Sequence, residues 1–73
     1  MTAAALQIDV LVNGEPRRVQ PGTTVESLLG ALGALASPCA VEINQEIVPR
    51  SQHGARALST GDRVEIVTFV GGG

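Results

Sequence analysis

Lysine, tryptophan and tyrosine are absent from this sequence of 73 residues, which has one cysteine, Cys39, and one aromatic residue, Phe69. Without lysine, the chain offers no ε-amine to form a Schiff base or to accept an acyl group. A single cysteine cannot form an internal disulfide, and together with the only histidine, His53, it cannot complete a zinc site. Because aromatic residues are so scarce, a folded core must be built from Val, Ile, Leu and Ala.

Cys39 and His53 raise one further question, because a cysteine and a histidine can form a protease-like dyad. A small buried thiol and an unrelated loop histidine are the commoner arrangement. A chain of this length buries only about 60% of the surface that its unfolded state exposes, which leaves little room for a deep substrate pocket. We therefore expect no self-contained enzyme site.

The charge balance excludes other classes of function. Five arginines stand against seven acidic residues, which gives a formal net charge of -2, and the positive residues form no cluster. We therefore expect no nucleic-acid partner. The first twelve residues contain no Lys or Arg, and Gln7 and Asp9 interrupt their apolar run. This pattern predicts neither a signal peptide nor a membrane span, so we expect a cytoplasmic protein.

The first part of the sequence has the pattern of a β-hairpin followed by a helix. Residues 6–13 alternate with period two, and Asn13-Gly14 is a strong turn signal, so a second strand is expected over about 17–20. Thr23 followed by Glu26 fits a capping box. Gly33 is a typical helix stop. We predict a helix over 24–32, whose apolar stripe consists of Val25, Leu28, Leu29 and Leu32.

The second part of the sequence predicts three further strands. Residues 40–44 alternate with Val41 and Ile43 inward, residues 47–48 form a short return strand, and residues 63–70 form the last strand. The segment 51–57 is polar and irregular. The apolar helix stripe must pack on one sheet face, and the first and last strands are placed at the sheet centre. We expect an α+β domain over residues 1–70, a β-grasp with a mixed sheet packed on one helix.

Three glycines, Gly71, Gly72 and Gly73, directly follow the last strand. Glycine is costly to order, so residues 71–73 should form a flexible C-terminal tail with a free α-carboxylate. A tail without side chains can thread into a narrow active site on another protein and present its carboxylate there. The alternative interpretations are a frayed end or a linker left by an expression system.

Apolar residues beside this tail predict a docking surface. Val64 and Ile66 should face the helix, which places Val67 and Phe69 on the opposite face of the last strand. Leu11 has the same outward parity on the first strand. If the two strands are neighbours, these three residues form an exposed apolar patch, which often marks an interaction surface.

Several motifs together carry a family resemblance. They are Val12-Asn13-Gly14, Gly22-Thr23-Thr24-Val25 with Leu28-Leu29, Val41-Glu42-Ile43-Asn44, Ile47-Val48-Pro49-Arg50, Gly61-Asp62-Arg63-Val64-Glu65-Ile66 and the terminal Gly72-Gly73. Over essentially its whole length the chain resembles the ThiS family, the ubiquitin-like β-grasp sulfur carriers of thiamine biosynthesis. Two positions depart from the usual pattern. Gly71 stands where relatives usually carry a side chain, and His53 stands where some carry a large aromatic residue.

The resemblance implies that an ATP-dependent activating enzyme adenylates the carboxylate of Gly73. A sulfur donor then displaces AMP and leaves a thiocarboxylate, with Gly72 and Gly71 as the thread. The implied partners are this activating enzyme, thiazole synthase, and a sulfurtransferase or cysteine desulfurase. The implied carrier needs no cofactor and performs no catalysis itself. Three alternatives stay open: a carrier for molybdopterin, cysteine or thiouridine synthesis, a ubiquitin-like protein modifier, and a β-grasp interaction module with an inert tail.

Overall fold

The computed structural model describes residues 7–69, so the predicted glycine tail and the predicted domain limit at residue 70 lie outside the described residues. The elements in chain order are β1 (Ile8–Val12), β2 (Glu15–Val19), α1 (Val25–Ala31), β3 (Cys39–Ile43), β4 (Glu46–Val48), the 3₁₀ helix η2 (Arg50–Gln52) and β5 (Arg63–Thr68). None of the helices in this part of the chain is long and apolar enough to cross a membrane.

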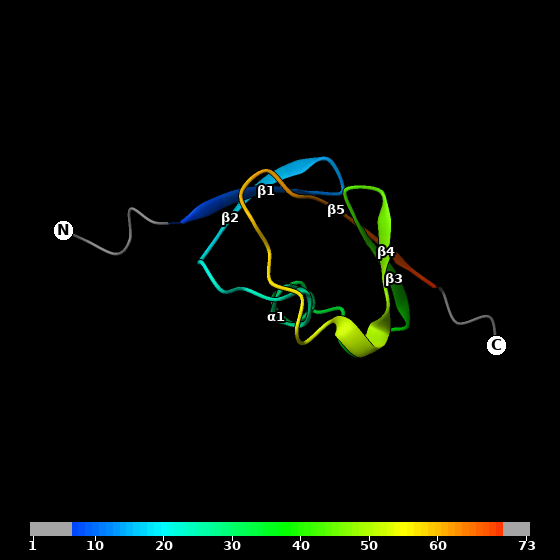
Figure 1. Cartoon of the computed structure of the whole chain (residues 1–73). Helices are drawn as coiled ribbons and strands as arrows, with labels where there is room; N and C mark the ends of the chain where they lie inside the picture. Colours follow the sequence, from blue (N-terminus) through cyan, green and yellow to red (C-terminus); the bar gives the residue numbers. More distant parts are fainter. Residues whose placement is uncertain (1–6, 70–73) are drawn as a thin grey trace.

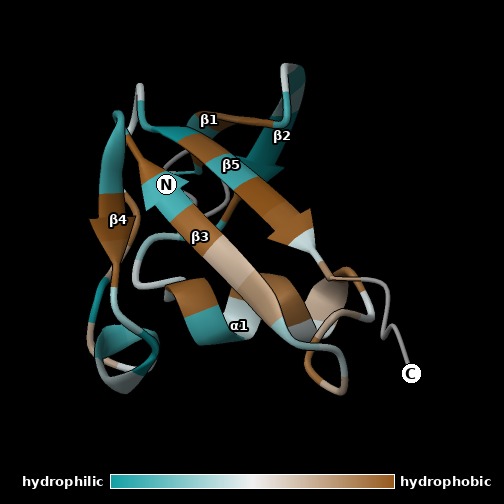
Figure 2. Ribbon diagram, turned by 90° about the vertical axis from the view of Figure 1, so that its right-hand side faces the viewer, coloured by the Kyte–Doolittle hydropathy of each residue, from teal (hydrophilic) through white to brown (hydrophobic). Residues whose placement is uncertain are grey.

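The strands form one mixed sheet in the order β2-β1-β5-β3-β4, and α1 lies across one face of it (Figures 1 and 2). β1 and β5 are parallel, and the other neighbouring strands are antiparallel. This is the predicted β-grasp arrangement, with the first and last strands away from the sheet edges. β5 pairs with β1 only at its start, through Arg63 and Val64, whereas its pairing with β3 continues to Thr68, so β3 holds its C-terminal end in place.

The hairpin between β1 and β2 turns at the predicted residues. Asn13 and Gly14 both have positive φ, at 52° and 85°, which matches a two-residue turn whose twist suits the strands. β2 begins at Glu15, directly after the turn, and is therefore longer at its start than the sequence pattern predicted. Its residues are mostly exposed, so hydrophobic alternation gave little signal there.

The predicted capping box at the start of the helix is wrong, because the N-cap is Thr24. The Thr24 side chain accepts a hydrogen bond from the Ser27 backbone N–H at 3.1 Å. Thr24 is held extended by a bridge to Ala57, while the Thr23 hydroxyl donates instead to the Gln20 carbonyl at 2.7 Å. A distant segment therefore sets the first residue of the helix at Val25.

Leu32 does not belong to the buried stripe, which corrects the predicted helix face. The helix ends at Ala31, and Gly33 has a φ of 75°. Gly33 and Ala34 donate their backbone N–H groups to the carbonyls of Gly30 and Leu29, which is the Schellman arrangement. Leu32 is the C-cap of this helix and its side chain is 37% exposed.

The core lies between α1 and the inner face of the sheet. Its buried apolar residues are Val10, Val12, Val25, Leu28, Leu29, Val41, Ile43, Val48, Leu58 and Val64. Ile66 packs against this cluster and is partly buried. The inward faces predicted for β1, β3 and β5 are therefore confirmed.

Two buried polar side chains hold the loops that the sequence pattern described only as irregular segments or turns. Asp62 accepts hydrogen bonds from the Ser59 backbone N–H at 2.8 Å and from the Asn44 side chain at 3.0 Å. Asn44 in turn accepts from the backbone N–H of Arg63 at 3.0 Å. His53 is also buried, and its Nε2 bonds to the Val48 carbonyl at 3.1 Å, so it anchors the segment after η2.

Candidate functional site

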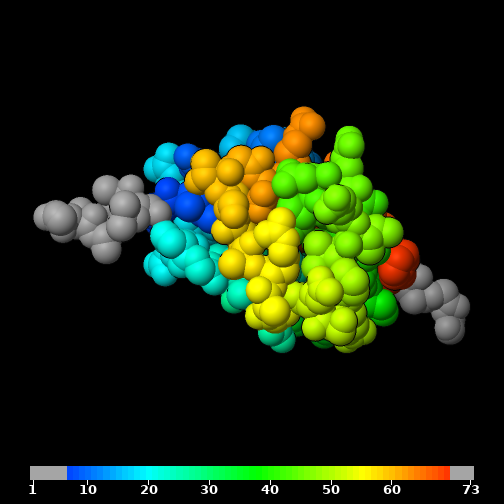
Figure 3. Space-filling model, viewed as in Figure 1, coloured from blue at the N-terminus to red at the C-terminus, as the bar shows by residue number. Residues whose placement is uncertain are grey.

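The candidate site is the end of β5, because the predicted reacting tail follows it directly. Gly71, Gly72 and Gly73 themselves lie outside the described residues. The antiparallel pairing with β3 runs through five residue pairs to Cys39 and Thr68. It continues one residue further, because Phe69 donates its backbone N–H to the Pro38 carbonyl at 3.0 Å. The chain is therefore fixed to the domain as far as Phe69. The last part of the described chain, drawn in red, lies at one end of the molecule (Figure 3).

Val67 and Phe69 are exposed on the sheet face opposite α1, as the sequence predicted. Their exposed fractions are 57% and 55%, which is high for large apolar side chains. Ala40 on β3 lies directly opposite Val67 and extends this apolar area. Together, these three residues form what we call the tail-base patch. The helix-facing residue Val64 on the same strand is only 1% exposed, so the parity of β5 is settled.

Leu11 shares this outward face but lies apart from the tail-base patch. The strands β1 and β5 are neighbours, and their register places Leu11 opposite Arg63. Val67 is four residues further along β5, a separation of about 13 Å at the rise of an extended strand. The expected three-residue patch is therefore divided. β1 and β5 are neighbours as predicted, but their register does not place Leu11 beside Val67.

The β1-facing edge of β5 carries a second feature, which the sequence reasoning missed. Beyond Val12 and Val64, β1 turns away into the hairpin, while β5 continues. The side chain of Asn13 fills the next pairing position, since it accepts from the Ile66 N–H at 2.8 Å and donates to the Ile66 carbonyl at 3.2 Å. Nothing in the sequence pattern distinguishes this role of Asn13 from its role in the turn.

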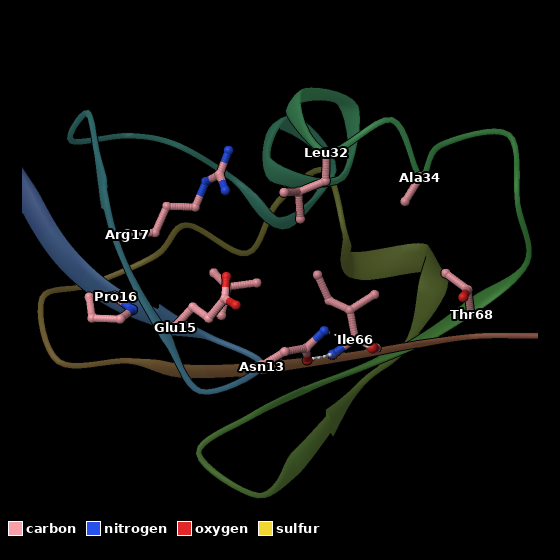
Figure 4. Close-up of a pocket in the computed structure, with 9 residues that line it drawn as sticks. Asn13, Glu15, Pro16, Arg17, Leu32, Ala34, Ile66 and Thr68 are labelled. Atoms are coloured by element: carbon pink, nitrogen blue, oxygen red, sulfur yellow. Dashed lines mark hydrogen bonds between the residues drawn. The ribbon is translucent and has the colours of Figure 1, made fainter.

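A pocket of about 400 Å³ opens beside this edge (Figure 4). Leu32 at the end of α1 and Ile66 on β5 lie on its two apolar sides, and Glu15 and Arg17 of β2 line its polar end. Its remaining lining residues are Val12, Asn13, Pro16, Ala34 and Thr68. The exposed Leu32, which the sequence assigned to the core, therefore borders a pocket at the base of the tail.

Cys39 and His53 line a different, smaller pocket between α1 and β3. Cys39 is partly buried. Because a carbonyl oxygen can only accept, the Nε2 of His53 carries the proton that it donates to Val48. Among the hydrogen bonds of the described residues, none joins the His53 ring to the Cys39 thiol. The geometry thus gives no base poised on this thiol.

Three comparisons with known proteins bear on this site. The sequence profile of the ThiS family matches residues 10–73. The sulfur carrier protein ThiS of Escherichia coli strain K12 is 32% identical over 66 residues, which are 90% of this chain and 100% of that protein. The crystal structure of the thiamine biosynthesis protein ThiS from Geobacter metallireducens matches with a TM-score of 0.76 and 38% identity, over 90% of this chain and all of that one.

Longer relatives also match. The thiazole synthase of Paramagnetospirillum magneticum is 48% identical over 64 residues, and that of Magnetococcus marinus is 45% identical over 62 residues. The matched part is 88% and 85% of this chain but only 20% and 19% of those proteins, so the chain spans about a fifth of their length. Since the family profile covers residues 10–73 and the sheet and helix match a solved ThiS structure, this chain belongs to the ThiS family.

Proposed function

We propose that this protein is a sulfur carrier of thiamine biosynthesis, and that the carboxylate of Gly73 is the group that carries sulfur. The observation that carries the proposal is the match of the family profile through residue 73. In addition, the last described strand, β5, is held by its pairing with β3 as far as Thr68. The protein is then the substrate of other enzymes and not a catalyst, and we place it in the cytoplasm with them.

The proposed chemistry has three steps. A carboxylate oxygen of Gly73 attacks the α-phosphorus of ATP, and pyrophosphate leaves. The terminal sulfur of a persulfide attacks the resulting acyl adenylate, AMP leaves, and an acyl disulfide forms. A second thiol reduces this disulfide, which leaves the thiocarboxylate on Gly73. Adenylation makes the step possible because it replaces a poor leaving group with a good one.

The proposed partners follow from these steps. They are an ATP-dependent activating enzyme, a sulfurtransferase or cysteine desulfurase as the source of persulfide, and thiazole synthase as the acceptor of sulfur. Two relatives named thiazole synthase support the last of these, because each contains a segment similar to this chain within one much longer polypeptide. We propose Val67 and Phe69 as the docking residues, with Leu11 at the far side of the same face.

Intact mass spectrometry tests the proposal. The purified protein is incubated with ATP, the activating enzyme of the same organism and a persulfide source. The expected product is heavier by the difference between one sulfur and one oxygen atom, and the added mass is located on Gly73 after proteolysis. A matched control lacks Gly72 and Gly73 and should remain unmodified. An unchanged mass of the full chain would refute the carrier function.

The same preparation separates the alternatives. Thiocarboxylate that supports thiazole formation with thiazole synthase indicates the thiamine pathway. Thiocarboxylate that is used only for molybdopterin, cysteine or thiouridine synthesis indicates another carrier. Covalent adducts between Gly73 and the lysines of other proteins indicate a protein modifier.

A further inference from the structure

We infer that the open edge of β5 at Thr68, with the pocket beside it, receives an extended segment of the activating enzyme, which adds to the sheet as a further strand. This inference rests on the proposed function, because it concerns how the activating enzyme grips the carrier while the tail reacts.

The backbone groups of β5 alternate in direction along the strand. Odd-numbered residues bond to β3, since Asn44 donates to the Arg63 carbonyl and Phe69 donates to the Pro38 carbonyl. Even-numbered residues face β1, since Leu11 and Asn13 donate to the carbonyls of Asp62 and Val64. The backbone N–H and C=O of Thr68 therefore point to the β1 side, where β1 has already ended at Val12.

Within residues 7–69, Thr68 is the one position at which this edge of β5 stays open. Asn13 satisfies both backbone groups of Ile66, so the pairing position before Thr68 is occupied within the domain. Among the hydrogen bonds of residues 7–69, the backbone groups of Thr68 have no partner on this side. An unpaired strand edge is a template for a strand from another chain.

The proposed tail has a short reach. Gly73, the proposed reacting residue, lies four positions beyond Phe69, and four extended residues span at most about 14 Å. An enclosed adenylation site must therefore lie within that distance of Phe69, so the activating enzyme must come close to the end of β5. Burying the N–H and C=O of Thr68 there without partners carries the cost of lost hydrogen bonds. An extended backbone supplies both partners at once.

The pocket beside Thr68 favours one kind of side chain in such a segment. In an added strand, the residue beside Thr68 points into the sheet–helix space, and its neighbours point to the outer face. The inward side chain enters the pocket between Leu32 and Ile66, so an apolar residue fits there (Figure 4). The outward neighbours lie beside Val67 and Phe69. One segment thus contacts both the pocket and the tail-base patch.

Amide hydrogen exchange tests the pairing directly. In the free carrier, the Thr68 amide should exchange fast, while the Val67 amide, which pairs with Ala40, should exchange slowly. In the complex with the activating enzyme, the Thr68 amide should become at least about tenfold slower, the equivalent of one good hydrogen bond. A Thr68 amide that exchanges equally fast in both states overturns the inference.

Matched variants test how much the added strand at Thr68 and the neighbouring pocket contribute to binding of the activating enzyme. Thr68→Pro removes the N–H, and proline is tolerated where the N–H of an edge faces solvent, so the fold should persist. Thr68→Val keeps the N–H and the branched shape and serves as its control. Leu32→Glu places a charge at the pocket, and Ile47→Glu, on the remote strand β4 at a residue 72% exposed, is its control.

The expected result is that Thr68→Pro and Leu32→Glu each raise the Kd for the activating enzyme about tenfold or more, while both controls bind as the wild type. Circular dichroism and the melting temperature confirm that each variant is folded. Wild-type affinity of folded Thr68→Pro and Leu32→Glu overturns the inference. If the Thr68 amide becomes protected in the carrier alone as its concentration rises, a second copy is the occupant and the inference is also overturned. If the wild type is not adenylated at all, the proposed function fails first.

Discussion

The side chain of Asn13 forms two hydrogen bonds with the backbone of Ile66, although the two residues are 53 positions apart. The amide group therefore substitutes for the residue that β1 would supply if it continued along β5. Asn13 also adopts a positive φ of 52° in the hairpin turn. One residue thus closes the turn and prolongs the pairing of the strand that ends at the proposed tail.

Asn13→Gly separates these two roles. Glycine accepts the positive φ but has no amide group, so the turn should persist while both hydrogen bonds to Ile66 are lost. We expect a loss of about 1–2 kcal/mol in the free energy of unfolding, measured by urea denaturation. The Ile66 amide should exchange faster. Asn13→Asp, which keeps an acceptor for the Ile66 N–H, should lose less; an equal loss in both variants would contradict the assigned role.

Leu28 and Leu32 are one turn apart, yet only Leu28 is in the core. Leu28 is 1% exposed, so Leu28→Ala should cost roughly 2–5 kcal/mol, close to the whole stability of about 5 kcal/mol expected of a small domain. Leu32→Ala should cost less than about 1.5 kcal/mol, because the side chain is 37% exposed. Thermal unfolding of the two variants checks this, and similar losses would refute the observed end of the helix.

Asp62 should contribute more to stability than the surface carboxylate Asp9. Asp62→Ala leaves the Asn44 amide and the Ser59 N–H without their acceptor, and it should cost about 2–3 kcal/mol. Asp9→Ala removes an ion pair with Arg18 in which both side chains are about two-thirds exposed, and it should change stability by less than about 0.5 kcal/mol. Chemical denaturation of both variants gives the comparison. Equal effects would mean that the Asp62 network is not structural.

Phe69→Ala tests the tail-base patch. We expect weaker binding to the activating enzyme and to thiazole synthase by about 2 kcal/mol or more, because an exposed aromatic residue at the base of the tail is well placed as an anchor. The loss of stability should be smaller than for Leu28→Ala, since Phe69 is 55% exposed. Ile47→Ala, on the same sheet face but on β4, serves as the control. Unchanged affinity of folded Phe69→Ala would remove this patch from the docking surface.

Cys39→Ser should leave sulfur transfer intact. The thiol is half-buried, and the Nε2 of His53 is already bonded to Val48, so neither feature marks a nucleophile. The mass increase at Gly73 should appear at the wild-type rate with ATP, the activating enzyme and a persulfide source. Loss of this product in a folded variant would identify Cys39 as a sulfur relay.

Elements with strong local signals could be predicted from the order of the residues. Alternation set the inward faces of β1, β3 and β5, Asn13-Gly14 set the hairpin, and Gly33 set the end of the helix, because each depends on backbone preferences within a few residues. Those elements and the motifs were also sufficient to indicate the β-grasp fold and the ThiS family.

Features that depend on pairing between distant segments follow from the tertiary contacts and not from local signals. The register of β1 on β5 separates Leu11 from Val67, and the bridge to Ala57 makes Thr24 the N-cap in place of Thr23. A period of two fixes the face of a strand but not its register with a parallel neighbour, which long-range packing selects. For the same reason, only the folded chain shows that β5 extends beyond the end of β1 and leaves its edge at Thr68 open beside the pocket.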